Sequence, residues 1–382
     1  MKNFKFNTQT ALFFGKGCVT ENAAVLRQYG KRAVIFTSIF AEGRENKGLK
    51  DMEKALTSQG IEYLVLDGVE VDPPVDTVVK LAEQAADFNA DFFIGIGGGS
   101  SLDTAKAAAV LLSNPEEENP YEAFYGMGTP SKSIKSETKI PMLAVPTTAG
   151  SGSEVSGFSV LTRADTNTKL CMYPLVFPEV AFLDADYIRE SPDFLIHTGV
   201  IDALAHGVET YLHVGSNPLN RTLAEYGFRL FAGFKDRMAE GKLIDEDFES
   251  MILAAYVQGM AFMQSSTTIP HGMGYPLSHI KHVSHGLANG IFLGEYIRGF
   301  KDQSLVQPVV KMCGFKDSEE FAAFCRLITE DDVDIEVTEQ EIQEWTDDFM
   351  KLDFRLAANP EKLDRNDIES LYRNTLKKYI IS

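Results

Sequence analysis

Residues 91–109 read DFFIGIGGGSSLDTAKAAA. The run 91–96 is apolar and rich in β-forming residues, three glycines follow at 97–99, and a helical pattern begins at Ser101. Consecutive glycines let a backbone approach a pyrophosphate closely, and the N–H groups and positive dipole end of the next helix complement its charge. The stretch therefore predicts a strand, a turn and a helix that bind a dinucleotide without a basic residue. A tight packing turn is the alternative explanation of the glycine cluster by itself.

The residues around this turn alternate between strand-like and helical patterns. Such alternation predicts a parallel sheet with crossover helices on its faces and ligands outside the carboxyl ends of the strands. The glycine turn follows about the third strand rather than the first, which departs from the usual Rossmann arrangement. The predicted strands are 33–37, 61–66 and 92–96, and the predicted helices are 49–59 and 75–88.

A second candidate loop, residues 146–154 (PTTAGSGSE), follows a strand-like run at 142–145. Its hydroxyls and backbone amides are suited to close over a bound nucleotide. A polar surface loop would explain the segment about as well if it stood alone.

The second half of the chain has helical patterns. The β signals fade after a strand-like run at 180–183, and Ser191-Pro192-Asp193 is a helix-start signal. We therefore predict two domains, an α/β domain over residues 1–186 and an all-helical domain over residues 187–382. The long amphipathic patterns lie at 194–212, 221–238, 248–263 and 368–379.

The composition narrows the range of functions. The chain has 382 residues and a net charge of −19, so its overall field repels phosphate backbones and anionic lipid surfaces but attracts cations. We expect no nucleic-acid partner and no membrane association, since there is neither a signal-peptide pattern nor an apolar run of about 18 residues. The four cysteines are widely spaced, which is typical of reduced thiols in a cytoplasmic protein.

The histidines are clustered. All seven fall between residues 197 and 285, and four of them lie within 271–285. Asp202 and His206 are four residues apart in a strong helical pattern, so both project from one face, as two ligands of one ion would.

Two further histidines, His271 and His285, complete a candidate set. They lie near the ends of two helical patterns that break around Pro276 and His282, so they can meet across a groove. One carboxylate and three imidazoles form an N₃O set that suits Fe(II), Zn(II), Co(II) or Mn(II) and leaves room for a substrate oxygen. Any one histidine is more simply a polar residue in a helix interface, but the four residues together favour a metal site that acts as a Lewis acid.

Four blocks in this order resemble the iron-containing (group III) alcohol dehydrogenases over nearly the whole chain. They are GGGS at 97–100 with Asp103 and Lys106, PTTAGSGSE at 146–154, DALAH at 202–206, and HG at 271–272 with SHG at 284–286. The resemblance implies an α/β N-terminal dinucleotide-binding domain with a parallel sheet, plus an all-α C-terminal metal-binding domain, in a dehydroquinate synthase-like architecture. It also implies an NAD(P)-dependent oxidoreductase that forms a homodimer or larger assembly. The metal that it implies is Fe²⁺ in the first place, with Zn²⁺ or Mn²⁺ as alternatives. The metal ligands that it implies are Asp202, His206, His271 and His285.

The resemblance also implies contacts to NAD. They are Gly98, Gly99, Ser100 and Asp103 in the first loop, Thr147, Thr148 and Ser151 in the second, Lys169 on the following strand, and Asp72. Many members carry an acidic residue for the adenosine ribose where this chain has Ser38. Ser38 would not exclude the 2′-phosphate of NADP, so NADP stays an alternative cofactor, whereas the neighbouring Glu42 and Glu45 favour NAD.

A second departure is Tyr275, where members acting on simple alcohols and diols often have a histidine as a proton relay. Lys281 and His282 add cations beside the last ligand, a pattern closer to the 4-hydroxybutyrate dehydrogenase-like branch. They would pair with the charged end of a short anionic aldehyde, of the succinate semialdehyde or sulfoacetaldehyde type, unless both are solvent-facing loop cations. Tyr275 and His279 are the candidates for proton exit.

The hypothesis for the reaction is reversible hydride transfer between nicotinamide and a short alcohol whose oxygen binds the metal. A neutral substrate of the butanol, 1,3-propanediol or lactaldehyde type is the alternative. A lyase of the dehydroquinate synthase type shares the architecture, but its highly anionic substrate needs more cations than Lys281 and His282. A nucleotide- or metal-binding regulator without turnover has no evident need for an open metal position.

Overall fold

The structure is a computed structural model that describes residues 3–39, 45–126, 139–165 and 168–381. It divides into two compact units. The sheet unit comprises Thr8–Thr148 and Gly152–Glu190, and the helical unit comprises Met1–Asn7, Ala149–Ser151 and Ser191–Ser382. The division expected after residue 186 differs from this one because local patterns do not report the long-range contacts that assign the short segments. No helix in the described ranges is long and apolar enough to cross a membrane.

The sheet unit is built on a six-stranded parallel sheet in the order β1-β8-β5-β4-β2-β3. Its strands are β1 (Ala11–Phe14), β2 (Arg32–Thr37), β3 (Glu62–Leu66), β4 (Phe92–Gly97), β5 (Met142–Pro146) and β8 (Val180–Leu183). The first three predicted strands are confirmed as β2, β3 and β4. Because β4 pairs with β5 in register up to Gly97 and Pro146, the two predicted loops leave adjacent strand ends.

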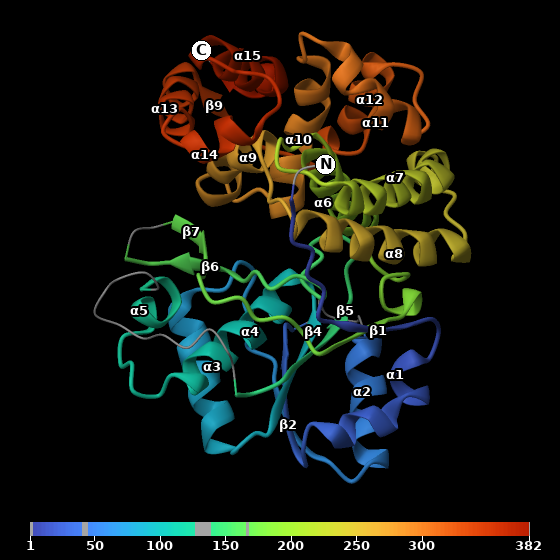
Figure 1. Cartoon of the computed structure of the whole chain (residues 1–382), viewed down its shortest axis with the longest axis vertical. Helices are drawn as coiled ribbons and strands as arrows, with labels where there is room; N and C mark the ends of the chain where they lie inside the picture. The colour runs from blue at the N-terminus through green and yellow to red at the C-terminus, as the bar shows by residue number, and fades with distance from the viewer. Residues whose placement is uncertain (1–2, 40–44, 127–138, 166–167, 382) are drawn as a thin grey trace. The chain divides into compact units, whose positions relative to one another are not determined.

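Helices cover both faces of this sheet, as the alternation predicts. Successive strand residues point to opposite faces, so Ile35 and Ile94 pack with α2, whereas Val34 and Phe93 pack with α3 and α4. Figure 1 shows α1 and α2 on one side of the sheet and α3 and α4 on the other. The elements are α1 (Cys18–Glu21), α2 (Lys47–Ser58), α3 (Val75–Asp87), α4 (Gly99–Ser113) and α5 (Pro120–Tyr125), with an antiparallel hairpin of β6 (Val160–Arg163) and β7 (Thr168–Cys171).

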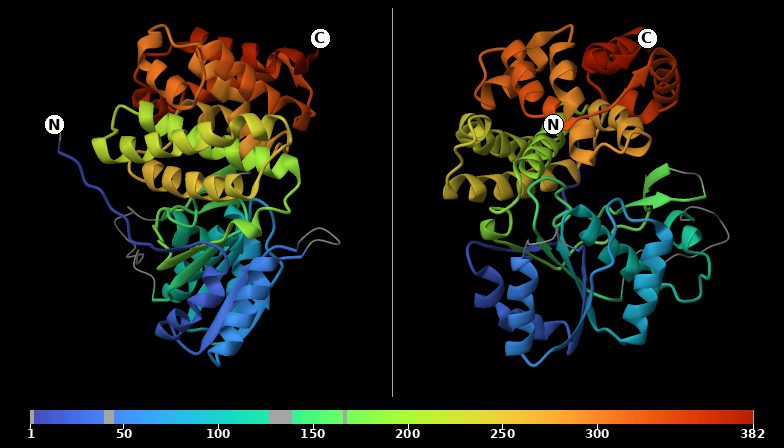
Figure 2. Two further views of the ribbon diagram at one scale, coloured as in Figure 1. Left: turned by 90° about the vertical axis from the view of Figure 1, so that its right-hand side faces the viewer. Right: turned by 180° about the vertical axis from the view of Figure 1, so that it is seen from behind.

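The helical unit contains the long helices that the sequence predicts, and Figure 2 shows them from two further sides. Helix α6 begins at Asp193, directly after Pro192, as the start signal predicts. Helix α9 runs through Pro276 to His279, so the break expected around Pro276 and His282 does not include Pro276 and lies between His279 and His285. Pro276 lies in the last turn of α9, where it removes only one backbone hydrogen bond. The helices are α6 (Asp193–Leu212), α7 (Pro218–Ala239), α8 (Asp245–Phe262), α9 (Ile269–His279), α10 (His285–Arg298), α11 (Gln307–Met312), α12 (Ser318–Leu327), α13 (Glu339–Phe349), α14 (Asp353–Ala358) and α15 (Arg365–Leu376).

Short elements complete the two units. Two-residue strands β9 (Val337–Thr338) and β10 (Ile380–Ile381) pair in parallel, which adds a small β element to the expected all-helical domain. The 3₁₀ helices are Ala23–Gln28, Ala185–Tyr187, Gln303–Leu305, Glu330–Asp332 and Lys377–Tyr379.

Helices α6 and α10 form the centre of the helical unit, and most residues of both are buried. Two glycines of α10 allow the close approach of these helices. A Cβ at Gly290 would lie 2.4 Å from the Ile201 side chain, and one at Gly286 would lie 2.3 Å from the Thr198 carbonyl oxygen. Helix α9 packs beside α10. This packing brings polar residues of three helices to one buried point.

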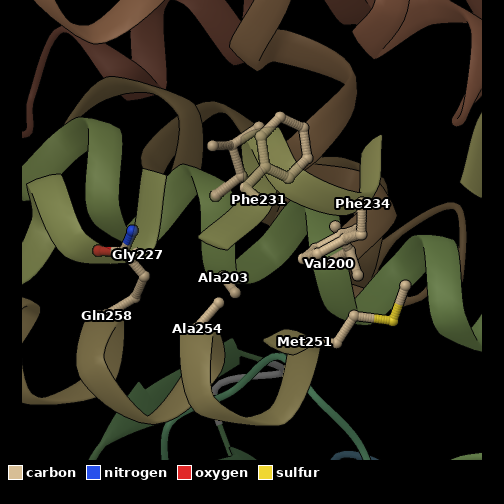
Figure 3. Close-up of a pocket in the computed structure, with 9 residues that line it drawn as sticks. Val200, Ala203, Gly227, Phe231, Phe234, Met251, Ala254 and Gln258 are labelled. Carbon is tan, nitrogen blue, oxygen red and sulfur yellow. The ribbon is translucent and has the colours of Figure 1, made fainter. Parts of the chain in front are cut away.

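A small apolar cavity lies between α6, α7 and α8 (Figure 3). Its polar member is Gln258, whose Nε2 donates to the Ala224 carbonyl oxygen at 3.2 Å. Gly207 and Gly227 leave room for this amide, since a Cβ at either position would lie less than 2.5 Å from it. Among the described residues, no titratable group lines the cavity, so it is a packing feature.

Candidate metal centre and dinucleotide loops

Helix α6 carries two of the predicted metal ligands into the interior of the helical unit. Asp202 and His206 are one turn apart, and each is only 5% exposed. Apolar residues fill most of the remaining helix surface, so the burial of α6 takes both polar side chains inside. A buried carboxylate needs a partner that offsets its desolvation.

Helices α9 and α10 bring the other two predicted ligands to the same point. His271 lies in the first turn of α9, and His285 is the first residue of α10. The Nε2 atoms of His271 and His206 are 3.1 Å apart, and His271 Nε2 lies 3.6 Å from Asp202 Oδ1. One ligand atom from each of Asp202, His271 and His285 lies within 4.8 Å of the others. The structure therefore groups Asp202, His271 and His285, and it places His206 beside His271.

The spacing and chemistry of these atoms fit a single divalent ion. Two ligands at about 2.0–2.2 Å from one ion stand roughly 3 to 3.5 Å apart at tetrahedral or octahedral angles. Two imidazole nitrogens 3.1 Å apart both direct lone pairs at the same point unless one of them carries a proton. A cation satisfies both lone pairs together with the carboxylate, and the N₃O set suits Fe²⁺, Zn²⁺ or Mn²⁺.

The protonation states of Asp202 and His206 favour a cation. Burial alone would raise the pKa of Asp202, but the facing histidines hold it well below its usual range. Burial lowers the pKa of His206 to about 4. An ionised carboxylate and a neutral imidazole are the forms that bind metal ions.

Glu209, which the sequence patterns did not single out, is a fully buried residue of α6 beside the cluster. One carboxylate oxygen accepts a hydrogen bond from His271 Nδ1, and the other accepts one from the Thr268 backbone N–H. Burial opposes a charge on either partner, yet Glu209 raises the pKa of His271 to about 9. Because Nδ1 is bonded to Glu209, His271 presents Nε2 to the other ligands. The helical spacing could have identified Glu209, since it lies two turns beyond Asp202 on the same face.

Two more buried side chains contact the ligands. Asn289 of α10 is fully buried, and its Nδ2 lies 3.3 Å from Asp202 Oδ1 and 3.1 Å from His285 Nε2. Phe262 at the end of α8 stacks on the His206 ring, with ring centroids 4.4 Å apart. These contacts fix the orientation of side chains from α6 and α10.

In the sheet unit, the two predicted loops lie against each other. The Thr147 N–H donates to the Gly97 carbonyl oxygen at 2.9 Å, and a Cβ at Gly98 would lie 3.4 Å from Thr148 Cγ2. Gly97 has a φ of +149°, which favours glycine, and α4 begins directly afterwards at Gly99. A helix N-terminus at the carboxyl end of parallel strands suits the pyrophosphate of a dinucleotide.

Four more predicted cofactor residues surround the start of α4. The Asp72 N–H donates to Ser100 Oγ at 3.1 Å, and Lys169 Nζ donates to the Asp72 carboxylate. The hydroxyl oxygens of Ser38 and Ser101 are 3.4 Å apart. The structure thus gathers Ser38, Asp72, Ser100 and Lys169 at one end of the sheet.

The Asp103 carboxylate forms its hydrogen bonds with other residues of the sheet unit. Its Oδ1 accepts from Ser153 Oγ at 2.6 Å, and its Oδ2 accepts from the Val160 N–H at 2.8 Å. The buried Lys106 Nζ donates to Ser153 Oγ at 2.6 Å and to the Phe158 carbonyl oxygen at 2.7 Å. Burial raises the pKa of Asp103 and lowers that of Lys106, and each opposes the other's shift. These bonds hold α4 to the segment that follows the second loop.

Two further residues of the cofactor prediction are treated separately. Ser151 belongs to the helical unit, and Glu42 lies outside the described residues. The cofactor contacts of all these residues remain predictions.

The predicted substrate and proton-relay residues lie on α9 and in the segment after it. Tyr275 is one turn beyond His271 on α9, and Nε2 of His279 is buried without a hydrogen-bond partner among the described residues. Lys281 Nζ pairs with Glu341 Oε1 at 2.6 Å. His282 is exposed and has a φ of +58°. The charge of Lys281 is therefore already paired within the chain.

Sequence comparison identifies the family. Residues 9–185 match the family described as iron-containing alcohol dehydrogenase, and residues 195–376 match the Fe-containing alcohol dehydrogenase family, C-terminal. The chain therefore belongs to the iron-containing alcohol dehydrogenases. It is an NAD(P)-dependent oxidoreductase acting on CH–OH groups, in a family that binds a divalent metal, typically Fe²⁺. The expected family, two-part fold and cofactor class are confirmed.

Relatives in this family have several named activities. The NADPH-dependent butanol dehydrogenase of Clostridium saccharobutylicum is 31% identical over 81% of this chain and 76% of its own. The lactaldehyde reductase of Escherichia coli K12 is 32% identical over 78% and 76%, and the sulfoacetaldehyde reductase of Bilophila wadsworthia is 31% identical over 75% and 72%. The iron-containing alcohol dehydrogenase structure from Thermotoga maritima has a TM-score of 0.85 and 29% identity, over 98% of this chain and 100% of that one.

Proposed function

We propose that this protein catalyses reversible hydride transfer between NAD(P) and a short-chain aldehyde or alcohol that carries an anionic group. The observation that supports the reaction is the cluster of Asp202, His271 and His285 in the helical unit, with His206 Nε2 3.1 Å from His271 Nε2. The names of its relatives include neutral substrates, butanol and lactaldehyde, and an anionic one, sulfoacetaldehyde. The sequence departure at Tyr275 favours the anionic class.

The side chains have separate tasks in this reaction. A divalent ion held by Asp202 and the three histidines would supply a Lewis acid for the substrate oxygen. Glu209 keeps the His271 ring turned so that Nε2 faces the other ligands. The glycine loop and the N-terminus of α4 bind the cofactor pyrophosphate. Nε2 of His279 or the hydroxyl of Tyr275 passes the proton on, since both lie on α9.

The test is a substrate panel with the metal-containing protein. NADH and NADPH oxidation would be followed with succinate semialdehyde, sulfoacetaldehyde, butanal and lactaldehyde, and with Asp202→Ala and His271→Ala variants. We expect faster reduction of the anionic aldehydes, a preference for NADH, and losses of about a thousandfold in both variants, because several kcal/mol of charge stabilisation are removed. A preference for butanal would instead support the second candidate, a neutral-alcohol dehydrogenase.

We further propose a cytoplasmic homo-oligomer. The support is family membership together with four cysteines that are free in the structure. Light scattering coupled to size-exclusion chromatography would show at least a dimer of the 42.3 kDa chain. A monomer at micromolar concentration would contradict the assembly.

A further inference from the structure

Arg355 of α14 is a buried cation with only neutral hydrogen-bond partners. The residue is 6% exposed. Its Nη1 donates to the Thr268 carbonyl oxygen at 3.0 Å and to Thr267 Oγ1 at 3.2 Å, and its Nη2 donates to the Tyr275 hydroxyl at 3.2 Å. Its Nε is buried and has no hydrogen-bond partner among the described residues. In the described part of the chain, no carboxylate lies within 4.0 Å of its guanidinium group.

A guanidinium in this setting lacks a direct counter-charge. An arginine is always protonated in proteins, and burying its charge among neutral groups is unfavourable unless an anion approaches it. Glu209 is the carboxylate whose pKa Arg355 helps to lower, after larger effects from His271 and the Thr268 N–H. Both Glu209 oxygens already accept hydrogen bonds from those two groups. The structure therefore leaves the charge of Arg355 available to an anion from outside the chain.

Arg355 lies beside the metal-binding face of α9. A Cβ at Gly272, the residue after His271, would lie 2.7 Å from Arg355 Cδ. Tyr275, which accepts its hydrogen bond, follows His271 by one helical turn. The Cβ atoms of residues one turn apart on a helix are about 5–6 Å apart, so His271 and Tyr275 are spaced on the scale of a short carbon chain.

We propose that Arg355, oriented by Tyr275, binds the carboxylate or sulfonate at the far end of a short ω-oxo or ω-hydroxy acid. This assignment rests on the proposed function and names the residue that reads the substrate charge. A planar guanidinium suits the two oxygens of such a group, and it forms charge-assisted hydrogen bonds with them. Lys281 is less suited because its ammonium already pairs with Glu341.

The test compares two aldehydes of equal chain length, succinate semialdehyde and butanal, with wild type, Arg355→Gln, Arg355→Lys and Lys281→Gln. Arg221→Gln, at an exposed arginine that also lies over a tyrosine ring, is the control. Its guanidinium lies 5.4 Å from the centroid of the Tyr211 ring, as that of Arg355 lies 5.3 Å from the Tyr275 ring. We expect Arg355→Gln to reduce kcat/KM for succinate semialdehyde by about 10- to 100-fold, mainly through KM. Butanal should change less than threefold, and Arg355→Lys should fall between.

Three results would overturn the assignment. Equal losses for both aldehydes in Arg355→Gln and Arg355→Lys would mean that Arg355 only supports the structure. An unchanged KM for succinate semialdehyde would mean that it does not contact the substrate. A selective effect in Lys281→Gln but not in Arg355→Gln would transfer the role to Lys281.

A binding measurement separates this assignment from the proposed function. Calorimetric titration of succinate into the metal- and NAD⁺-loaded protein does not require turnover. If no aldehyde is reduced by wild type, the proposed function fails. Succinate binding that is lost in Arg355→Gln but kept in Arg221→Gln would still support the anion site. Absent binding to wild type, or equal binding to Arg355→Gln, would overturn it.

Discussion

The hydrogen bond at His271 Nδ1 decides which ring nitrogen faces the other predicted ligands. Glu209 accepts the hydrogen bond from Nδ1, so Nε2 is the atom that points to His206 and Asp202. This side-chain contact joins α6 to α9 inside the helical unit. Carboxylates that contact a ligating imidazole in this way typically alter metal affinity by 10- to 100-fold.

We therefore expect Glu209→Gln to weaken metal binding about tenfold and Glu209→Ala by up to about a hundredfold. The glutamine can still accept one hydrogen bond, whereas alanine leaves both the His271 and Thr268 N–H groups unpaired. Zn²⁺ affinity would be measured by competition with a chromophoric chelator, with circular dichroism as a control for folding. Wild-type affinity in the folded alanine variant would show that Glu209 does not orient His271.

Glu154 offers a prediction of pH dependence in the sheet unit. Burial raises its pKa from 4.5 to about 7, so the folded protein keeps a proton that the unfolded chain releases above pH 4.5. Its contribution to stability is therefore lost as the pH rises through this window. Glu154→Gln should stabilise the protein relative to wild type by up to about 3 kcal/mol more at pH 8 than at pH 4. Urea denaturation at the two pH values would check this, and a pH-independent difference would contradict it.

At the scale of elements, the sequence predicted those strands and helix starts that hydrophobic periodicity and turn residues determine. The apolar strand before Gly97 and the alternation around it identified β2, β3 and β4, and the Ser191-Pro192-Asp193 signal located the start of α6. Pro276 does not break α9 because it lies in the last turn, where the helix is already ending at His279. Arg355 could not be found from the sequence, since only tertiary packing brings α14 to the face of α9.

A substitution of Lys106 tests how the two loops are held together. Its ammonium is fully buried between Ser153, the Phe158 carbonyl and Asp103, so Lys106→Met leaves the Asp103 carboxylate without its counter-charge. We expect a loss of stability of about 3–5 kcal/mol and weaker NADH binding. Thermal denaturation and NADH fluorescence titration would measure these effects, with the exposed Lys80→Met as control. Unchanged stability and NADH affinity would show that this network does not brace the loops.

At the scale of the whole molecule, the chemistry is divided between the two units. The predicted metal ligands all belong to the helical unit. The first glycine loop and the beginning of the second, up to Thr148, belong to the sheet unit. A net charge of −19 favours a divalent cation and disfavours an anionic cofactor, so the dinucleotide depends on local helix and backbone N–H groups.

Metal removal should therefore affect the units unequally. Without the ion, the N-terminal turns of α9 and α10 lose the bond that joins them to α6, so we expect faster amide hydrogen exchange there. Exchange in β2, β4 and β5 should stay the same. Hydrogen exchange followed by mass spectrometry, before and after chelation, would show this difference, and uniform change across both units would argue against it.

The most direct test of the central claim is the rate of aldehyde-dependent NAD(P)H oxidation as a function of bound metal. Protein stripped by a chelator would be titrated with Fe²⁺ under anaerobic conditions, with metal content determined at each point. A rate that rises in proportion to occupancy and saturates near one ion per chain is the predicted result. Full activity in the metal-free protein would contradict metal-dependent hydride transfer at Asp202, His206, His271 and His285. Full metal occupancy without NAD(P)H oxidation would contradict it as well.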